Sequence, residues 1–441
     1  MARLLSLLFT TILLSAQQEP EVRIRTDVRQ VLVPVVVTDS KGHHVTGLKA
    51  EDFAVYEDGA RQKVTSFSTD SDGGSTVAAI KAARPEGIAA PVTAAATSRT
   101  YVICFDTLHS SFGNFARIRD AVEKLFDKEV GSGAKYALVS LGRQLRVIQT
   151  ATADQKLLLS KVRSKNFFDV IRGVDGGIMA MELATTESWL ARYCGGCPCG
   201  AGAGRDADCR TKRQVLRQQV YAQVERTVLL ERAFHEGLTG LVGELAKVPG
   251  ARTMIMVSEG FSVTPGAEFL AVASAYLPAA SEFMFPPDTR EGALRQTLAT
   301  ATRNDIRVYS LDARGVALPS FGAGGVNDAG ASLGVSAARN RGGGMLSSLE
   351  SKQNSIAFQN EAGPQQLAVV TGGVYYHNNN DFFGNLRAAV TDGREYYLLT
   401  YTPGSAEEDG KYRKITVEVA GQRKASVRAK DGYWAGEPAK P

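Results

Sequence analysis

Residues 101–111 read YVICFDTLHSS, and this stretch decides the fold of the chain. It opens with a continuous apolar run, YVICF, which has the length and composition of a strand that is buried on both faces. The run stops at Asp106, and apolar residues at helical spacing follow over residues 116–130. A strand, a polar loop and a helix in this order predict the first unit of an open parallel sheet, in which ligands bind at the carboxyl ends of the strands.

The chain downstream repeats this alternation of strands and helices. Further strands are expected at residues 135–141, 145–150, 253–257, 306–311 and 373–376. Further helices are expected at residues 154–162, 214–248 and 381–390. We therefore predict an α/β domain at residues 99–392, with a mostly parallel sheet that helices cover on both faces.

Patterns of strands alone flank this domain on both sides. Residues 20–70 contain the β-branched run QVLVPVVVT and a hairpin that turns at Asp58-Gly59. Residues 71–98 are rich in Gly, Ala and Thr and predict a connector, and residues 393–436 return to strands. Because each flank has too few strands to be stable alone, we expect the two to pair into one all-β sandwich from which the α/β domain is inserted.

The chain begins with MARLLSLLFTTILLSAQQ, which has the layout of a secretory signal peptide. One Arg precedes an apolar run from Leu4 to Leu14, and the small residues Ser15 and Ala16 precede a polar segment. The run is too short for a bilayer core, which needs roughly 20 residues. We expect residues 1–16 to be removed and the mature chain to be secreted or periplasmic, without a membrane span. A buried N-terminal helix is the alternative.

Composition and charge exclude several classes of protein. The 441 residues are 44% hydrophobic and 22% charged, which is ordinary for a globular chain and excludes disorder throughout. A formal net charge of +5 is spread over a large surface, so we expect no nucleic-acid partner.

Two segments of the α/β domain lie outside its periodic pattern. Residues 315–344 are rich in Gly and predict a long loop, and residues 166–213 predict an insertion that carries clustered cysteines. These are Cys194, Cys197, Cys199 and Cys209. In an exported chain they favour two disulfides of undecided pairing, while a zinc site and free thiols remain alternatives. Cys104 lies in the first buried strand and is interpreted as a core residue.

The first strand and its loop resemble those of von Willebrand factor type A (VWFA) domains, whose metal-ion-dependent adhesion site (MIDAS) begins with Asp-x-Ser-x-Ser. The whole mature chain resembles the acidobacterial VWFA-related proteins. The similarity lies in VVVTDSKGHHVTGLKAEDFAVYEDGARQKVTSF near the front, FDTLHSS and YSLDARG at two strand ends, and EYYLLTYTP near the end. The resemblance implies a VWFA-like, Rossmann-like fold over residues 99–392 and a role in binding.

The same resemblance implies a site for Mg²⁺ or another divalent cation. Asp106 and Ser110 match its first and third positions, while Leu108 stands where a hydroxyl is expected. Ser258-Glu259-Gly260 stands where Ser-Asp-Gly is expected, so Glu259 is the third candidate ligand. One carboxylate with hydroxyl ligands suits a hard cation and leaves a position open for a partner. The favoured interpretation is a degenerate site in which Asp106 caps the following helix, and functional metal binding is the alternative.

The residues beside these ligands are expected to line the binding loops. They are Thr107, His109, Ser111, Ser258 and Asp312. Thr107 or Ser111 could supply the missing hydroxyl, and Asp312 follows a strand, where a plain turn residue is the favoured interpretation. His109 could serve as an acid or a base beside Asp106, but a loop histidine that faces solvent is favoured.

Signatures of catalysis are weak. Residues 330–334, GASLG, match a nucleophile-elbow pattern, but no predicted strand precedes them. His235-Glu236 lacks the second histidine of a zinc protease. We therefore expect a non-catalytic, exported binding or adhesion-type protein whose partner is a protein or a component of the cell envelope. A metal-independent scaffold of the periplasm or envelope is the alternative, and an enzyme is less favoured.

Overall fold

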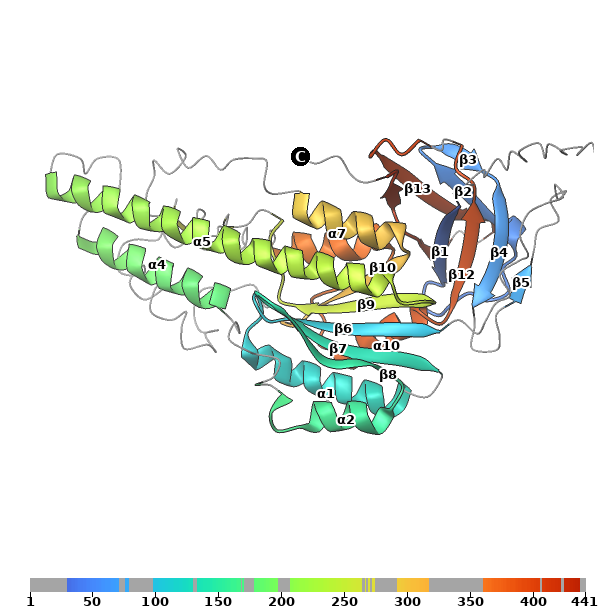
Figure 1. Cartoon of the computed structure of the whole chain (residues 1–441), viewed down its shortest axis with the longest axis horizontal. Helices are drawn as coiled ribbons and strands as arrows, with labels where there is room; N and C mark the ends of the chain where they lie inside the picture. The colour runs from blue at the N-terminus through green and yellow to red at the C-terminus, as the bar shows by residue number, and fades with distance from the viewer. Residues whose placement is uncertain are drawn as a thin grey trace, which may run out of the picture.

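The structure is a computed structural model whose strands form three sheets (Figure 1). The predicted signal peptide and most of the Gly-rich segment at residues 315–344 lie outside the residues that the structure describes. The described residues are 30–70, 76–78, 98–129, 133–167, 169, 178–196, 207–263, 266, 269, 272–273, 292–316, 360–404, 407–421 and 424–436.

The central sheet has six strands in the order β8-β7-β6-β9-β10-β11. The strands are β6 (Arg99–Asp106), β7 (Ala134–Leu141), β8 (Leu145–Thr152), β9 (Ala251–Ser258), β10 (Ile306–Asp312) and β11 (Tyr375–Tyr376). Neighbouring strands are parallel except β7 and β8, which form an antiparallel hairpin. The order of the strands reverses between β6 and β9, as in doubly wound sheets. The predicted α/β class with a mostly parallel sheet is confirmed.

Helices cover both faces of this sheet (Figure 1). On one face lie α1 (Phe112–Glu129), α2 (Gln155–Arg163) and α10 (Phe382–Asp392). On the other lie α5 (Ala207–Ala246), α7 (Gly292–Arg303) and a helix at residues 360–371. Successive residues of β6 alternate between the two cores, so Ile103 packs with α1 and Cys104 packs with α5. Cys104 is fully buried, which confirms it as a core residue.

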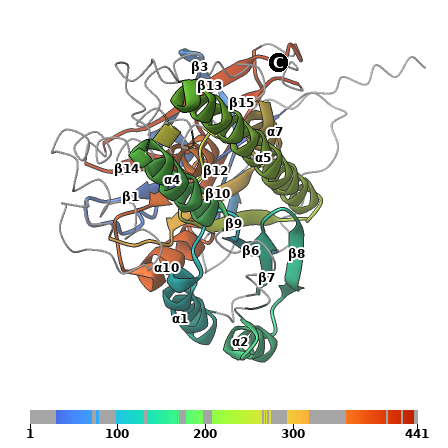
Figure 2. The same cartoon turned by 90° about the vertical axis from the view of Figure 1, so that its left-hand side faces the viewer.

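Helix α4 (Ile178–Gly196) runs beside the N-terminal half of α5, and the two extend beyond the parallel sheet (Figures 1 and 2). The sequence pattern missed α4, and it predicted the start of α5 too late. Cys194 and Cys209 belong to these two helices, while Cys197 and Cys199 lie outside the described residues. The two disulfides therefore stay a prediction. Within the described ranges, no helix combines the length and the apolar character that a membrane span needs.

The other two sheets are antiparallel and combine strands from both ends of the chain. One has the order β14-β1-β12-β4-β5 and the other the order β15-β13-β2-β3. From the N-terminal side come β1 (Val31–Thr38), β2 (Phe53–Glu57), β3 (Ala60–Gln62), β4 (Val64–Asp70) and β5 (Thr76–Ala78). From the C-terminal side come β12 (Tyr396–Tyr401), β13 (Tyr412–Val419), β14 (Ser426–Arg428) and β15 (Gly432–Trp434). Val33 and Leu399 of one sheet share a core with Val55 and Ile415 of the other.

The turn at Asp58-Gly59 joins β2 to β3, as the sequence predicts. Both residues have positive φ angles, 49° and 82°, which is the backbone of a tight hairpin turn. After β3 the chain crosses to the other antiparallel sheet, in which β4 pairs with β12 and not with β2.

A buried cluster around Asp392 joins the parallel sheet to the antiparallel ones. Arg428 binds both carboxylate oxygens of Asp392, at 2.6 and 3.1 Å. The hydroxyl of Tyr309 donates to the same carboxylate at 2.9 Å, and the Nε2 atom of His44 lies 2.8 Å from it. Burial by itself raises the pKa of Asp392, but the hydrogen bonds from His44 and Arg428 and the charge of Arg428 lower it to about 2. We refer to these four residues as the junction cluster.

Candidate functional site

The carboxyl ends of β6 and β9 meet where the strand order reverses, and ligands of open α/β sheets bind at such a point. Asp106 ends β6, Ser258 ends β9 and Asp312 ends β10. Asp312 lies opposite Ser258 in the register of β9 and β10. The hydroxyl of Ser258 donates to Oδ2 of Asp106 at 2.6 Å. The fold thus brings these three predicted residues to one edge of the sheet, which we call the carboxyl edge.

Asp106 is fully buried, and both of its carboxylate oxygens have donors from the protein. Oδ1 accepts the backbone N–H groups of Leu108 and His109, each at 3.1 Å. The Nδ1 atom of His109 lies 3.0 Å from Oδ1 and 2.9 Å from Oδ2. Asp106 therefore caps the turn that follows β6, whereas α1 begins only at Phe112.

The side chain of His109 is buried, so the prediction of a loop histidine that faces solvent is wrong. Its side chain is 6% exposed, and its ring packs against those of Phe234 and Phe261, with centroid distances of 4.7 and 5.7 Å. Its Nε2 atom lies 2.8 Å from Oε1 of Glu231, which belongs to α5. The sequence pattern could not predict this contact, because Glu231 lies 122 residues after His109 in the chain and α5 brings it to the loop.

The two carboxylates decide the charge of His109. Burial by itself lowers the pKa of His109, because a low-dielectric interior disfavours its charged form. The charges of Asp106 and Glu231, together with the hydrogen bonds to both, outweigh burial and raise the pKa of His109 well above its usual value. The geometry places a carboxylate acceptor against each ring nitrogen, as a doubly protonated imidazole requires.

His235 lies one helical turn after Glu231 and behaves in the opposite way. Its Nε2 atom is 3.8 Å from Oε2 of Glu231, beyond hydrogen-bond distance. Burial lowers the pKa of His235 and outweighs the charge of Glu231, which raises it, while the positive charge of His109 lowers it further. His235 is therefore neutral at pH 7. Within the described part of the chain, its Nδ1 atom and Oε2 of Glu231 have no hydrogen-bond partner.

Glu259 joins the loop after β9 to the start of α1. Its Oε1 atom accepts the backbone N–H and the hydroxyl of Ser111, each at 2.6 Å, and the amide of Asn114 at 2.9 Å. A carboxylate at this place also complements the partial positive charge of a helix N-terminus. The hydroxyl of Ser110 accepts the backbone N–H of Glu259 at 3.0 Å. Three predicted residues thus hold the two loops together.

Thr107 and Asp312 have local partners. The hydroxyl of Thr107 donates to the carbonyl of Leu141 at the end of β7, at 3.2 Å. Arg314 pairs with both oxygens of Asp312, at 2.9 and 2.8 Å, and also contacts Glu361 at 3.2 Å. Oδ1 of Asp312 accepts the backbone N–H of Arg314 at 2.9 Å, which is the bond of a turn residue.

The residues predicted to hold a divalent cation do not fit one in this arrangement. A hard cation needs several oxygen ligands that are free to bind it. The oxygens of Asp106 hold backbone, hydroxyl and imidazolium donors, Oε1 of Glu259 holds three donors, and the hydroxyl of Ser110 already accepts an N–H. Within the described ranges, no three His, Cys, Asp or Glu side chains are grouped so that they could hold a metal ion.

Glu231 is the site residue that the sequence analysis missed. A signal was available, because Glu231 continues the buried stripe of α5 that passes through Val220, Val224 and Thr227. A carboxylate on the apolar face of a helix is rarely buried without a partner. His235, four residues later, lies on the same face and marks the same position.

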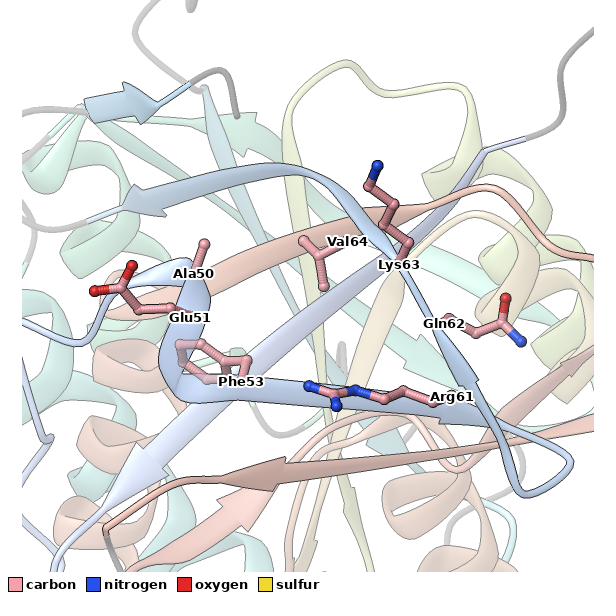
Figure 3. A pocket seen from close by; sticks show the side chains of 7 residues that line it. All are labelled: Ala50, Glu51, Phe53, Arg61, Gln62, Lys63 and Val64. Carbon is pink, nitrogen blue, oxygen red and sulfur yellow. The ribbon is translucent and has the colours of Figure 1, made fainter. Parts of the chain in front are cut away.

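A separate cavity of about 650 Å³ lies on the antiparallel sheets (Figure 3). It is lined by Ala50, Glu51, Phe53, Arg61, Gln62, Lys63 and Val64, which come from β2 to β4 and from the short helix η1 (Ala50–Asp52). Its lining carries charges of both signs and shares no residue with the carboxyl edge. It therefore specifies no class of ligand.

No family model matches the sequence, and no curated protein matches it. An aerotolerance-related membrane protein from Bacteroides fragilis is 12% identical with a TM-score of 0.31, over 67% of this chain and 98% of the other. BatB from Bacteroides thetaiotaomicron is 10% identical with a TM-score of 0.28, over 67% and 97% of the two chains. A von Willebrand factor type A protein from Catenulispora acidiphila is 9% identical with a TM-score of 0.29, over 90% and 76%. Scores this low assign no family.

Proposed function

We propose that this chain is an exported, non-catalytic binding protein of the VWFA type, related to the acidobacterial VWFA-related proteins. In this proposal, residues 20–70 and 393–436 form one β-sandwich that carries the α/β domain, and the carboxyl edge recognises a protein or a component of the cell envelope. Secretion or a periplasmic location rests on the predicted signal peptide. The order of the strands, the VWFA-like loop at Asp106 and the family motifs support the proposal.

One observation carries the proposal: the loops after β6 and β9 are joined in a fixed platform at the point where such sheets bind ligands. Ser110 and Ser111 of the first loop bind Glu259 of the second. Arg117 of α1 is exposed beside this connection and donates to Asn114 at 2.6 Å and to the carbonyl of Arg314 at 3.1 Å. A rigid loop platform with an exposed arginine suits protein recognition, because arginine is enriched where binding energy concentrates.

The contacts of His109 with two carboxylates support a non-catalytic role for the protein. A general acid or base must have a ring nitrogen within reach of the reacting group. Both ring nitrogens of His109 are bound to carboxylates, and the side chain is almost completely buried. The Ser258 hydroxyl is buried and donates to Asp106, so it is no free nucleophile either.

The experiment is capture of partners from an envelope extract by the immobilised protein, with two matched variants. Arg117→Glu reverses an exposed charge at the carboxyl edge, and Arg61→Glu does the same at the cavity on the antiparallel sheets. We expect Arg117→Glu to weaken binding of the captured partner roughly tenfold or more, and Arg61→Glu to leave it unchanged. Equal binding by both variants would contradict recognition at the carboxyl edge.

The second candidate is a metal-independent scaffold whose contacts lie away from the carboxyl edge. The internal pairing of Asp106, Glu259 and Asp312 favours it over metal-dependent adhesion, because both oxygens of Asp106 and of Asp312, and Oε1 of Glu259, already accept hydrogen bonds. The capture experiment separates the two: a scaffold would retain its partners when Arg117 is reversed.

A further inference from the structure

We propose that His109 is a built-in cation that holds α5, and with it the α4–α5 hairpin, to the carboxyl end of β6. The hairpin consists of α4 and residues 207–230 of α5. In this role His109 is a positioning residue that neutralises buried carboxylates, as a metal ion does in metal-dependent sites. The part of the inference that concerns recognition rests on the proposed function.

The geometry of the cluster points to a cation. The side chains of Asp106 and Glu231 are 0% and 2% exposed, so two like charges are buried beside one imidazole. Buried carboxylates are costly unless they are paired and hydrogen-bonded. The two ring nitrogens of His109 lie 2.9 and 2.8 Å from one carboxylate each. In the described part of the chain, neither carboxylate has an ion pair with Lys or Arg.

Among the described residues that contact this cluster, one further titratable ring lies beside the two carboxylates, and the other neighbours are apolar or neutral. His235 of α5 faces Glu231 at 3.8 Å, and Ser258 of β9 binds Asp106. The rings of Phe234 and Phe261 pack against the imidazole. Phenylalanine rings exclude water and offer no hydrogen bond to a carboxylate, so His109 supplies the positive charge of the cluster.

Glu231 lies at the place where α5 changes its neighbours. On its C-terminal side, a Cβ atom at Gly237 would meet Leu141 of β7 at 2.7 Å, and Thr239 binds Thr297 of α7 at 2.7 Å. On its N-terminal side, Gln223 and Arg226 bind Glu182 of α4, at 3.0 and 3.1 Å. The ion pair with His109 therefore anchors α5 at the boundary between its sheet-packed half and the hairpin.

The hairpin is the part of the molecule that such an anchor would orient. Figure 1 shows it extending from the parallel sheet on the side away from the antiparallel sheets. It carries several exposed large apolar side chains, which are Met181, Val215, Tyr221 and Leu229. A rigid anchor at Glu231 keeps this surface in one orientation relative to the carboxyl edge, without any bound metal.

The protonation state of His109 can be measured directly in the unmodified protein. The chain has five histidines, so ¹⁵N labelling of histidine gives few ring signals, and His109→Gln identifies those of His109. We expect both ring nitrogens of His109 to carry protons at pH 7 and to keep them well above the usual histidine pKa of roughly 6.5. A neutral His109 ring at pH 7 would overturn the proposal.

Chemical rescue tests whether the charge, and not only the shape, of the ring is needed. His109→Ala should lower the midpoint of thermal unfolding by roughly 10 °C. Added imidazole should restore part of this loss at pH 6, where imidazole is charged, and little at pH 8.5. His235→Ala is the matched control, because the ring that it removes is neutral and should be replaced by neutral imidazole, which is more abundant at pH 8.5 than at pH 6. A His109→Leu variant as stable as the natural protein would overturn the proposal.

Hydrogen exchange tests the anchoring of the hairpin. In Glu231→Gln, amide exchange over residues 207–230 should rise at least several-fold, while β6 and β9 exchange as before. Unchanged exchange over residues 207–230 would overturn the anchoring role. Neither measurement needs a partner, so a negative result here would not contradict the proposed binding function. In turn, a capture experiment that contradicts recognition at the carboxyl edge would not contradict the ion pair.

Discussion

The carboxyl edge and the junction cluster bury carboxylates with different kinds of cation. At the junction, Asp392 has a bidentate bond to Arg428, whose guanidinium is always charged in proteins. At the carboxyl edge, Asp106 and Glu231 share one imidazole, whose charge depends on its surroundings. The comparison leads us to expect different stability limits at the two ends of the parallel sheet: the junction should lose stability in acid, and the carboxyl edge should lose stability in base.

The largest effect is expected when the carboxyl edge loses its central carboxylate. Asp106→Ala removes the acceptor of two backbone N–H groups and of the Ser258 hydroxyl, and it leaves His109 with one carboxylate. We expect the free energy of unfolding in urea to fall by about 4 kcal/mol, as when one member of a buried ion pair is removed. If the free energy of unfolding fell by less than an exposed ion pair usually contributes, the cluster would not be needed for stability.

Loss of the junction carboxylate should cost less. In Asp392→Asn the amide keeps the shape and some of the hydrogen bonds, so we expect a loss of about 2–3 kcal/mol by urea unfolding. The matched control is Glu244→Gln, because the pair between Glu244 and Lys247 is 2.6 Å long but about 70% exposed on each side. The control should change stability by less than about 1 kcal/mol. Equal losses in both variants would contradict a special role for burial at Asp392.

The pH dependence of stability separates the two clusters. The folded-state pKa of Asp392 is lowered from 3.8 to about 2, so its contribution is complete above the unfolded value and is lost as the pH falls from 3.8 to about 2. This contribution is about 2 kcal/mol. The folded-state pKa of His109 is raised, so its contribution is complete below the unfolded value and is lost as the pH rises through the folded one.

Unfolding curves between pH 2 and pH 10 test this assignment. Relative to the natural protein, Asp392→Asn should flatten the acidic side of the stability profile, and His109→Gln should flatten the alkaline side. If His109→Gln leaves the alkaline side unchanged, the histidine is not held in its charged form.

A smaller effect is expected from Ser258→Ala. The Ser258 hydroxyl donates to Asp106 at 2.6 Å and accepts the N–H of Gly260 at 2.9 Å. Its removal takes one hydrogen bond from the Asp106 carboxylate and one from the N–H of Gly260. We expect the free energy of unfolding in urea to fall by about 1–2 kcal/mol. Ser160→Ala is the control, because the exposed Ser160 hydroxyl donates to a carbonyl of its own helix, and its removal should cost little.

The smallest effect concerns divalent cations. Because both oxygens of Asp106 and Oε1 of Glu259 already accept hydrogen bonds, we expect the same thermal midpoint in the presence of a chelator and of millimolar Mg²⁺ or Mn²⁺. A cation at about 100 times its dissociation constant would add roughly 2.7 kcal/mol. A raised midpoint that disappears in Asp106→Ala would show instead that the edge rearranges to bind a metal.

Sequence patterns sufficed for the elements whose periodicity is local. The run before Asp106 is apolar at every position because β6 lies between two covered faces, and this marks a central strand without knowledge of its neighbours. The turn at Asp58-Gly59 was predictable because it needs positive φ angles that Gly adopts freely. Helix α4 was missed, because its residues lie in a segment whose Gly and Cys content obscures helical spacing.

The sequence by itself determined the strand–loop–helix unit at Asp106 and the loops that meet at the carboxyl edge. Only the tertiary structure decided the charge and exposure of the residues in them. From the sequence alone, His109 is predicted to be a loop residue that faces solvent. In the fold, α5 places Glu231 against it. The reason is physical: a strand or a turn follows from interactions between near neighbours in the chain, whereas burial and electrostatic pairing depend on groups that folding brings from far away.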